Sequence, residues 1–392
     1  MRGVGIALIG AILLLLREPS ALRHHPGAKL FLWLFAAYAG AALVSAVDAV
    51  APGKTWGTVA GILRFAPLGI YTCFAVRRPG KVRSLYMATA VVVAVWVVDA
   101  WVQAATGYGL AGASDPERLS GIFGATNLKL GQALSAFAPF VLWAARERWG
   151  RRGLLLAFFA VLGPILLSGS RASWICYAVV SLAFLWREAG SFRRFALTCL
   201  GAGLIAGVAG LLAWQVSPRF QERIAHTLPA FNGTSAGLDA ALTGRLEIWT
   251  TSLRLYAAHP VNGVGVRGFR VAYPSAASPG DHFLTREKCG EGEGACHAHQ
   301  VVLEVATETG TLGVLAWLAA VVLAIRTWWR AGPLARDRAF VPGVSLVAIF
   351  FPLNTHMAFY SAWWGLLAAW MFAVWCAALF ADLPDMDAAR DA

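Results

Sequence analysis

Apolar runs long enough to cross a lipid bilayer are the feature that most restricts the fold of this chain. Residues 85–105 and 195–216 are two examples, and each has about the 20 residues that a membrane-spanning helix requires. Of the 392 residues, 58% are hydrophobic and 14% are charged, whereas soluble domains contain about 25% charged residues. A soluble domain of this length cannot bury so much apolar surface. The sequence therefore predicts an all-α polytopic membrane protein.

Eleven spans are predicted, with boundaries that are loose by a few residues. The first run is short, so either an upstream helix is missing or this run is half of a re-entrant pair, which gives about 11–12 helices. We expect N-terminal transmembrane helices in 1–216, a periplasmic loop domain with amphipathic helices in 217–298, and C-terminal transmembrane helices with a short cytoplasmic tail in 299–392. The spans are 3–16, 30–50, 56–76, 85–105, 128–145, 153–168, 172–186, 195–216, 300–325, 339–354 and 359–380.

The distribution of the net charge of +12 indicates membrane topology rather than nucleic-acid binding. Eighteen of the 33 basic residues form five clusters, and these occupy alternate loops between the apolar runs. The positive-inside rule makes those loops cytoplasmic, which places residues 217–298 on the outer side. The clusters are Arg17, Arg23 and Lys29; Arg77, Arg78, Lys81 and Arg83; Arg146, Arg148, Arg151 and Arg152; Arg187, Arg193 and Arg194; and Arg326, Arg330, Arg336 and Arg338.

Within the outer segment, residues 244–258 have the spacing of an amphipathic helix. Thr243 is a suitable N-cap and Pro260 would end the helix. Residues 274–296 are rich in Gly, Pro and Ser and are expected to be irregular. The face expected to be apolar carries Leu246, Trp249, Leu253 and Tyr256.

Two of the six cysteines, Cys289 and Cys296, share the outer segment, and the other four lie in predicted spans. Two neighbouring cysteines in an oxidising compartment favour a disulfide. The rival interpretation is a zinc site made with His297 and His299, but the spacings do not match a zinc module. We therefore expect a disulfide and no metal.

Three residues on the outer side stand out, although each has an ordinary structural explanation. Arg171 lies at the outer end of a predicted helical hairpin, where an arginine often only snorkels to the interface. Arg245 begins the amphipathic helix and could be a solvated charge or a partner for Glu247. His299 could be only a polar residue at the start of its helix. Together they place two guanidiniums and an imidazole near one membrane surface.

That set of side chains suits a lipid diphosphate. Guanidinium groups bind phosphate oxygens bidentately and keep their charge, so two of them can stabilise a diphosphate leaving group without a metal. A neutral imidazole can take the proton from an attacking hydroxyl, and the positive end of a helix disfavours the imidazolium form. The single Asp-x-Asp sequence, residues 385–387, lies in the cytoplasmic tail and on the wrong side for this chemistry.

The chain resembles the O-antigen ligases within the O-antigen ligase and polymerase superfamily over roughly residues 55–380. The family motif is His-Asn-x-x-Leu-(x)4-Glu-x-Gly-x-x-Gly, and this chain departs from it with Gln300 in place of Asn, which puts one secondary hydrogen bond in doubt. The matching residues are His299, Gln300, Leu303, Glu308, Gly310 and Gly313; Ser-Gly-Ser-Arg171; Gly244-Arg245-Leu-Glu-Ile-Trp249 followed by Pro260 and Gly263-Val-Gly265; and the segments 118–124 and 351–356.

The resemblance implies a glycosyltransferase of the bacterial inner membrane, with its active site on the periplasmic side and no cofactor. Such an enzyme moves O-antigen polysaccharide from undecaprenyl diphosphate to a sugar hydroxyl of lipid A–core, with inversion and without a metal. By motif, His299 would be the base, and Arg171 and Arg245 would hold the diphosphate.

Three further basic residues are candidates for substrate binding. A charge inside an apolar span, as at Arg64, is costly unless it faces a cavity or an anion. Lys129 lies at the outer end of its span, where snorkelling is an ordinary alternative. Arg118 belongs to a segment that resembles the family.

Other functions stay open at this point. An O-antigen polymerase would use the same donor with a lipid-linked glycan as acceptor, and a protein O-oligosaccharyltransferase would use Ser or Thr. The modest outer loop and the segment 351–356 favour the ligase. A transporter would have internal repeats and paired charges near mid-membrane. No clear repeat is present, and Arg64 and Asp99 are the deep charges.

Overall fold

The computed structural model describes residues 10, 25–113, 118–127, 129–216, 221, 225, 244–285, 289, 293–355 and 357–381. This part of the chain is helical apart from short connections and one hairpin of two short strands, β1 (Tyr108–Gly109) and β2 (Gly112–Ala113). Six of its helical segments are long and apolar enough to cross a membrane, which confirms the prediction of an all-α polytopic membrane protein. They are α3 (Pro26–Val44), the pair α4 (Pro52–Leu63) and α5 (Phe65–Ala75), α6 (Pro79–Thr106), α7 (Leu130–Leu167), α15 (Val301–Arg330) and α17 (Ala362–Phe380).

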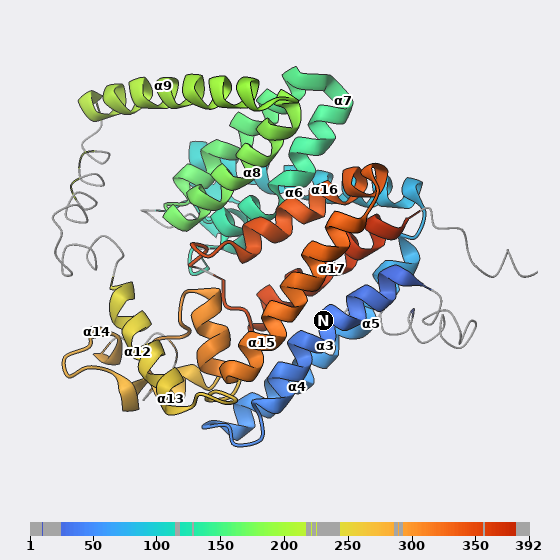
Figure 1. The fold of residues 1–392 in the computed structure, drawn as a ribbon. Helices are drawn as coiled ribbons and strands as arrows, with labels where there is room; N and C mark the ends of the chain where they lie inside the picture. Colours follow the sequence, from blue (N-terminus) through green and yellow to red (C-terminus); the bar gives the residue numbers. More distant parts are fainter. Residues whose placement is uncertain are drawn as a thin grey trace, which may run out of the picture.

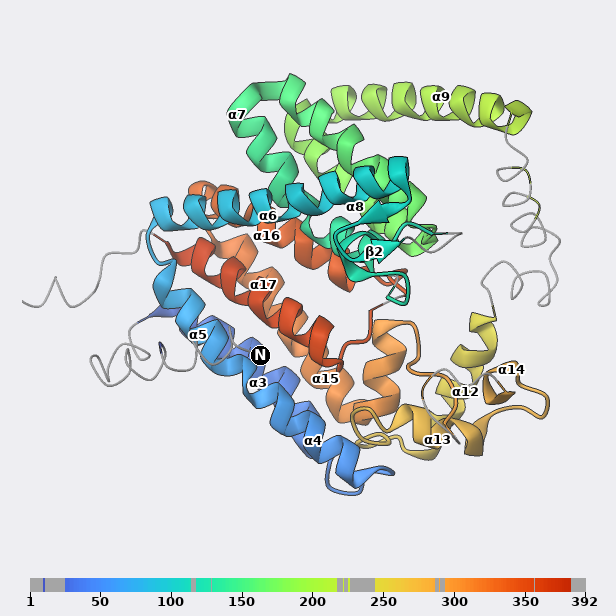
Figure 2. The same ribbon diagram turned by 180° about the vertical axis from the view of Figure 1, so that it is seen from behind.

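The helices pack in two groups (Figures 1 and 2). One group consists of α6, α7, α8 (Arg171–Ala189) and α16 (Pro333–Phe350), and the other of α3, α4, α5, α15 and α17. The two groups are joined because α16 packs against both α7 and α17. Helix α9 (Phe192–Val216) follows α8 and extends along the edge of the first group (Figure 1).

Three more predicted spans are helices, namely 172–186 in α8, 195–216 in α9 and 339–354 in α16. The predicted span 3–16 lies outside the described residues except for Gly10, and the Asp-x-Asp sequence at 385–387 lies outside them entirely.

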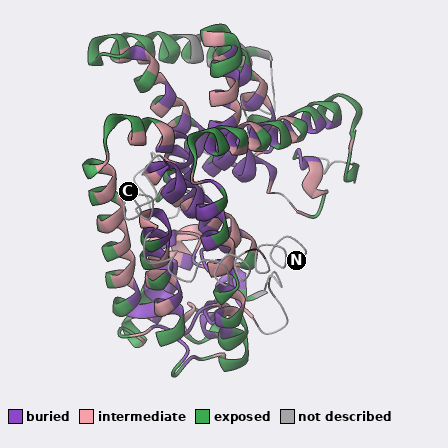
Figure 3. Cartoon of the chain, turned by 90° about the vertical axis from the view of Figure 1, so that its right-hand side faces the viewer, coloured by how far each residue is buried: buried purple, intermediate pink, exposed green. Residues whose placement is uncertain are grey.

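Large apolar side chains are exposed along the outer faces of the spanning helices. Val91 of α6 is 65% exposed, Leu156 of α7 is 73% exposed and Val322 of α15 is 61% exposed. Figure 3 shows exposed residues running along whole helices rather than only at their ends. An apolar surface of this extent is unfavourable in water and is what lipid chains cover.

One predicted span is divided in the structure, and two others are joined in a single kinked helix. The span 56–76 is divided at Arg64, which ends α4 and precedes α5. The spans 128–145 and 153–168 are the two arms of α7, which meet at Gly150, where φ is 65°. Glycine adopts this backbone angle without the steric cost that a side chain would bring.

The predicted span 300–325 lies within α15, but this helix is not straight. The chain turns at Gly310, where φ is 64°, so that residues 301–309 form a short arm of α15 and residues 311–330 form a long arm (Figure 1). A side chain at Gly310 would collide with the backbone of Val261 and Asn262. The turn is therefore a contact between two parts of the chain that lie far apart in the sequence.

The segment 244–298 packs beside the short arm of α15 (Figures 1 and 2) and contains α12 (Arg245–Ala258), α13 (Phe269–Ala276) and α14 (His282–Thr285). Helix α12 confirms the predicted helix, and α13 and α14 put two short helices in or at the edge of a region that was expected to be irregular. This segment has a small core of its own, which includes Ile248, Leu255, Phe269, Tyr273 and Phe283.

Two details of the predicted helix 244–258 are wrong. Its N-cap position is occupied by Gly244, while Thr243 lies outside the described residues. The buried face is not the predicted one, because Leu253 is 56% exposed whereas small hydroxyl residues are buried. Such side chains let α12 pack closely against α15, and their hydroxyls can bond to a carbonyl within the helix. The buried residues are Ile248, Thr251, Ser252 and Leu255.

Candidate active site

The turn of α15 is bound to the loop that follows α12. Four backbone hydrogen bonds join residues 260–265 to residues 307–312. Gly263 and Gly310 lie where the two backbones approach most closely, and a side chain at either position would collide with the opposite segment. Two motifs from distant parts of the sequence thus form one rigid unit. The bonds run from Val264 N to Thr307 O (2.9 Å), Gly265 N to Glu308 O (3.1 Å), Thr311 N to Pro260 O (2.8 Å) and Leu312 N to Val261 O (3.1 Å).

His299 lies immediately before the short arm of α15. Gln300 is the N-cap, and its Oε1 accepts a hydrogen bond from Leu303 N at 2.6 Å, so the residue that departs from the family motif supplies the helix cap. His299 itself has φ of 54°, a backbone conformation that costs a non-glycine residue about 1 to 3 kcal/mol and is concentrated at functional sites.

The imidazole of His299 is oriented by a backbone carbonyl. Its Nδ1 lies 2.7 Å from the carbonyl oxygen of Thr355. Because a carbonyl oxygen only accepts hydrogen bonds, Nδ1 carries the proton, and the lone pair of the neutral ring is on Nε2. The ring of His297 lies against that of His299, with 3.9 Å between the ring centres. The half-buried His299 is therefore held in the tautomer that a general base requires.

Arg171 and Arg245 begin two different helices, and the positive charge of one acts on the other. Arg171 is the first residue of α8, after the N-cap Ser170, and Arg245 is the first residue of α12. Burial, and then the positive charge of Arg171, hold the pKa of Arg245 below its ordinary value. Two like charges held close together repel one another, and a bound anion offsets this repulsion. The pair is therefore suited to binding a phosphate group.

Arg118 lies beside the turn that precedes Arg171. Its Cγ is 3.2 Å from the position that a Cβ of Gly169 would occupy, and Leu119 N donates a hydrogen bond to Leu167 O at 3.0 Å. Gly169 has φ of 68° and presents no side chain, which gives the stem of Arg118 room over the turn. The structure thus places the segment 118–124 next to the Ser-Arg motif.

Residues 156–318 match the family model described as O-antigen ligase. This match supports a relationship of the chain to the O-antigen ligase and polymerase superfamily. No curated protein matches it. The matched range contains Arg171, Arg245 and His299, so the three predicted catalytic residues lie inside the region that carries the family resemblance. The matched family suggests a glycosyltransferase-like enzyme and, in general, lipid-linked polysaccharide substrates.

Two other candidates for substrate binding, Lys129 and Arg64, lie against aromatic rings. Lys129 occupies the N-cap position of α7, and its ammonium nitrogen is 5.2 Å from the centre of the Trp363 ring. Arg64 is exposed at the break between α4 and α5, and its guanidinium is 5.8 Å from the centre of the Phe65 ring. Both contacts are cation–π interactions, which stabilise a charge near apolar surroundings. A role of either residue in substrate binding stays a prediction.

Two buried carboxylates are part of the site, although sequence reasoning gave them no role. Glu304 Oε1 accepts a hydrogen bond from Tyr360 N at 3.3 Å, and Glu308 Oε2 accepts one from Arg267 N at 2.8 Å. Both side chains are fully buried on the short arm of α15. Glu304 thus holds residues 351–361, which supply the carbonyl that orients His299. Two acidic residues four positions apart in an apolar helix were a signal that the sequence offered.

Arg270 of α13 binds residues beside the disulfide. Its Nη2 donates to Cys296 O at 3.3 Å, and its Nη1 lies 3.9 Å from Glu293, which also forms an ion pair with Lys54. Burial and the neighbouring Arg267 lower the pKa of Arg270, while Glu308 acts in the opposite direction.

A disulfide joins Cys289 to Cys296 in the structure, and neither sulfur is then a thiolate ligand for zinc. A different group of possible metal ligands is present, which the sequence analysis did not single out. One ligand atom from each of Glu247, Asp281 and His282 lies within 4.8 Å of the others. Each also has a protein partner: His282 Nδ1 lies 2.9 Å from Glu247 Oε2, and Asp281 accepts a hydrogen bond from the Tyr273 hydroxyl at 2.7 Å. Glu247 is thus a partner of His282.

Replacing both Cys289 and Cys296 with serine is expected to have a local effect. A disulfide that closes so short a loop contributes on the order of 2 kcal/mol at most, because a small loop loses little entropy on closure. The double variant should insert and fold, but should have lower activity because Arg270 and the backbone before His299 lose a restraint.

Thiol labelling without prior reduction measures this bond directly. Cys199→Ser, in α9, is the control for the loss of a cysteine outside the site. Free reaction of both Cys289 and Cys296 in the untreated protein would show that other contacts order the loop.

Proposed function

We propose that this protein is an O-antigen ligase of the bacterial inner membrane. It transfers O-antigen polysaccharide from undecaprenyl diphosphate to a sugar hydroxyl of lipid A–core, at the periplasmic face. The observation that carries the proposal is the family match over residues 156–318, which contains Arg171, Arg245 and His299. The two guanidiniums, whose positive charges act on one another, would bind the diphosphate. We also propose that residues 1–216 and 299–392 contain the transmembrane helices and that residues 217–298 form a periplasmic domain.

The proposed reaction is a single displacement. The acceptor hydroxyl oxygen attacks the anomeric carbon of the donor sugar from the face opposite the diphosphate, which inverts that carbon. As the new carbon–oxygen bond forms, the bond to the diphosphate oxygen breaks and its electron pair stays with the diphosphate. Nε2 of His299 takes the proton of the hydroxyl. Arg171 and Arg245 stabilise the charge that develops on the leaving group.

The fixed orientation of His299 supports its role as the base. The Thr355 carbonyl selects the tautomer, and Glu304 holds the same loop through Tyr360 N. This arrangement resembles the use of a hydrogen-bonded second residue to orient a catalytic histidine in other enzymes. The base is therefore in place before substrate binds, and little reorganisation is needed during the reaction.

An acceptor assay tests the proposal against its alternatives. Purified protein is incubated with lipid-linked O-antigen and one of three acceptors: lipid A–core, a second lipid-linked glycan, or a peptide that contains Ser and Thr. Glycan transfer to lipid A–core is the expected result. Transfer to the lipid-linked glycan would identify a polymerase, and transfer to the peptide would identify a protein O-oligosaccharyltransferase.

Transfer is expected to continue in EDTA, because the proposed mechanism uses two arginines where other enzymes use a divalent cation. The measurement compares initial rates before and after chelation and after addition of magnesium, manganese or zinc. A rate that is lost in EDTA and restored by one of these ions would contradict metal independence. It would also give the cluster of Glu247, Asp281 and His282 a role in the reaction.

A further inference from the structure

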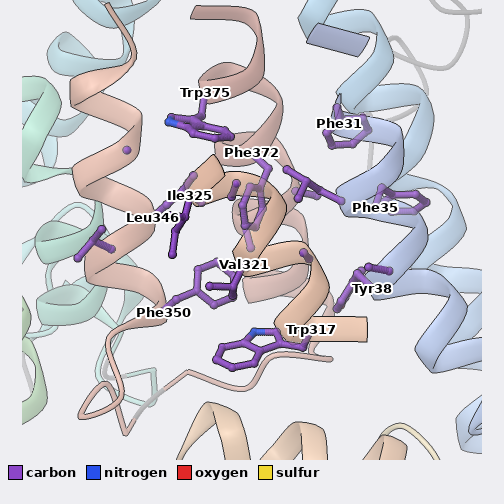
Figure 4. Close-up of a pocket in the computed structure, with 18 of the residues that line it drawn as sticks. Phe31, Phe35, Tyr38, Trp317, Val321, Ile325, Leu346, Phe350, Phe372 and Trp375 are labelled. Atoms are coloured by element: carbon purple, nitrogen blue, oxygen red, sulfur yellow. The ribbon is translucent and has the colours of Figure 1, made fainter. Parts of the chain in front are cut away.

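A long apolar groove lies between the two groups of helices. Its volume is about 570 Å³, and it runs beside the long arm of α15, with α3 and α16 as its sides and α17 as its floor. Figure 4 shows aromatic side chains from all four helices pointing into it. The rings include Phe35, Tyr38, Trp317, Phe350, Phe372 and Trp375.

The surroundings of the groove determine what kind of ligand it takes. α3, α15 and α17 are membrane-spanning segments, and the rim of the groove carries exposed apolar side chains, among them Ile325 (50% exposed), Trp329 (70%) and Val347 (54%). A volume of this size is within the range of about 300–1,000 Å³ that is usual for ligand sites. A nearly all-apolar cavity that opens among spanning helices fits a hydrocarbon chain of a lipid.

The position of the groove relative to the site indicates which lipid it binds. One end of the groove is formed by Phe359 and Tyr360, which belong to the loop 351–361 between α16 and α17. The same loop supplies the Thr355 carbonyl that orients His299. It is fixed at this end by two hydrogen bonds, from the Tyr38 hydroxyl to Phe359 O (3.0 Å) and from Tyr360 N to Glu304 Oε1 (3.3 Å).

The groove therefore ends at the loop of the base and not at the arginines. Arg171 begins α8 and Arg245 begins α12, and none of the described residues that line the groove belongs to either helix. In the proposed reaction the arginines hold the donor and the base acts on the acceptor. The groove therefore ends beside the residue that would act on the acceptor, and away from the residues that would hold the donor.

We propose that the groove binds an acyl chain of the lipid acceptor. The chain lies along the long arm of α15, and the acceptor sugar approaches His299 from the side of the loop 351–361. This proposal rests on the proposed function, because it requires a lipid-anchored acceptor and a separate donor site. It adds a binding site within the membrane that selects acylated acceptors over acceptors without acyl chains.

Filling the groove tests the proposal. Ala320 lines the groove from α15, and Val322 lies on the same helix but outside the groove and is 61% exposed. Ala320→Trp should raise the KM for acylated acceptor about tenfold, the loss that exclusion of about two methylene groups produces. The KM for donor and the KM for deacylated acceptor should stay unchanged. Val322→Trp, which adds a similar volume on the lipid-facing side, should behave as wild type.

Binding of lipid A in detergent, measured without donor, gives a readout that does not depend on turnover. Weaker binding by Ala320→Trp than by wild type and Val322→Trp is the expected result. Val347→Trp, which narrows the groove from α16, repeats the test if Ala320→Trp does not fold. Equal binding by the groove and control variants would overturn the proposal. A raised KM for the donor alone would also overturn it and would place the donor's prenyl chain in the groove.

These outcomes separate the groove from the reaction. A wild-type protein that transfers no glycan to any acceptor contradicts the proposed function, whatever the variants do. A wild-type protein that transfers glycan to lipid A–core, with equal KM values in Ala320→Trp and Val322→Trp, contradicts only the groove.

Discussion

His299→Ala is expected to abolish glycan transfer while expression and donor binding stay near normal. A general base typically contributes about 100- to 10,000-fold to a rate, so the loss should be plain in a transfer assay. The structure supports this expectation because the Thr355 carbonyl fixes the proton on Nδ1 and leaves the lone pair on Nε2. Donor binding should persist because Arg171 and Arg245 lie on other helices.

His297→Ala is the matched control for this variant. His297 lies outside the family motif but packs against the ring of His299, so its loss should reduce the rate far less. The measurement is the initial rate of transfer for both variants at saturating donor. Substantial turnover by His299→Ala would remove the imidazole from the mechanism. Equal losses in both variants would show that the two imidazole rings in contact act as a unit.

The second large effect is expected at the paired arginines. Arg245→Ala should lower transfer by about 100-fold or more, which is the usual effect of removing a group that stabilises developing charge. Arg245→Lys should also be impaired, because lysine keeps the charge but not the two-pronged geometry that matches phosphate oxygens. The same order is expected for Arg171, since its charge acts on Arg245.

Arg254→Lys is the control on the same helix. Arg254 of α12 is an exposed residue whose Nη1 donates to Ala276 O at 3.1 Å, away from the first turn. Its variant should transfer glycan at nearly the wild-type rate. Lysine variants of Arg171 and Arg245 that match wild type in rate and in donor KM would show that charge alone suffices, and the proposed diphosphate clamp would then be wrong.

Much of the architecture could be predicted because it depends on patterns that are local in sequence. The length of an apolar run is set by bilayer thickness, so the predicted spans overlap helices wherever the structure describes them. The spacing of residues 244–258 also predicted helix α12, apart from its N-cap and its buried face.

The remaining features depend on contacts between distant segments. Glycine is common in membrane helices, so Gly310 alone did not indicate a turn. The turn exists because the loop 260–265 occupies the space beside it. The prediction of which face of α12 is buried was wrong because close packing favoured Thr251 and Ser252 over larger side chains. The carbonyl of Thr355 has no sequence signal, since any residue could supply it.

The short arm of α15 has a consequence for the path of the chain through the bilayer. At 1.5 Å per residue, residues 301–309 extend about 14 Å, roughly half of the hydrocarbon layer of about 30 Å. An arm of that length cannot cross the layer, so the crossing is made by residues 311–330, which extend about 30 Å at the same rise per residue. Within α15, residues 311–330 alone then span the bilayer. A label at His299 and a label at Thr311 would report the same aqueous compartment, and a label at Arg330 would report the other.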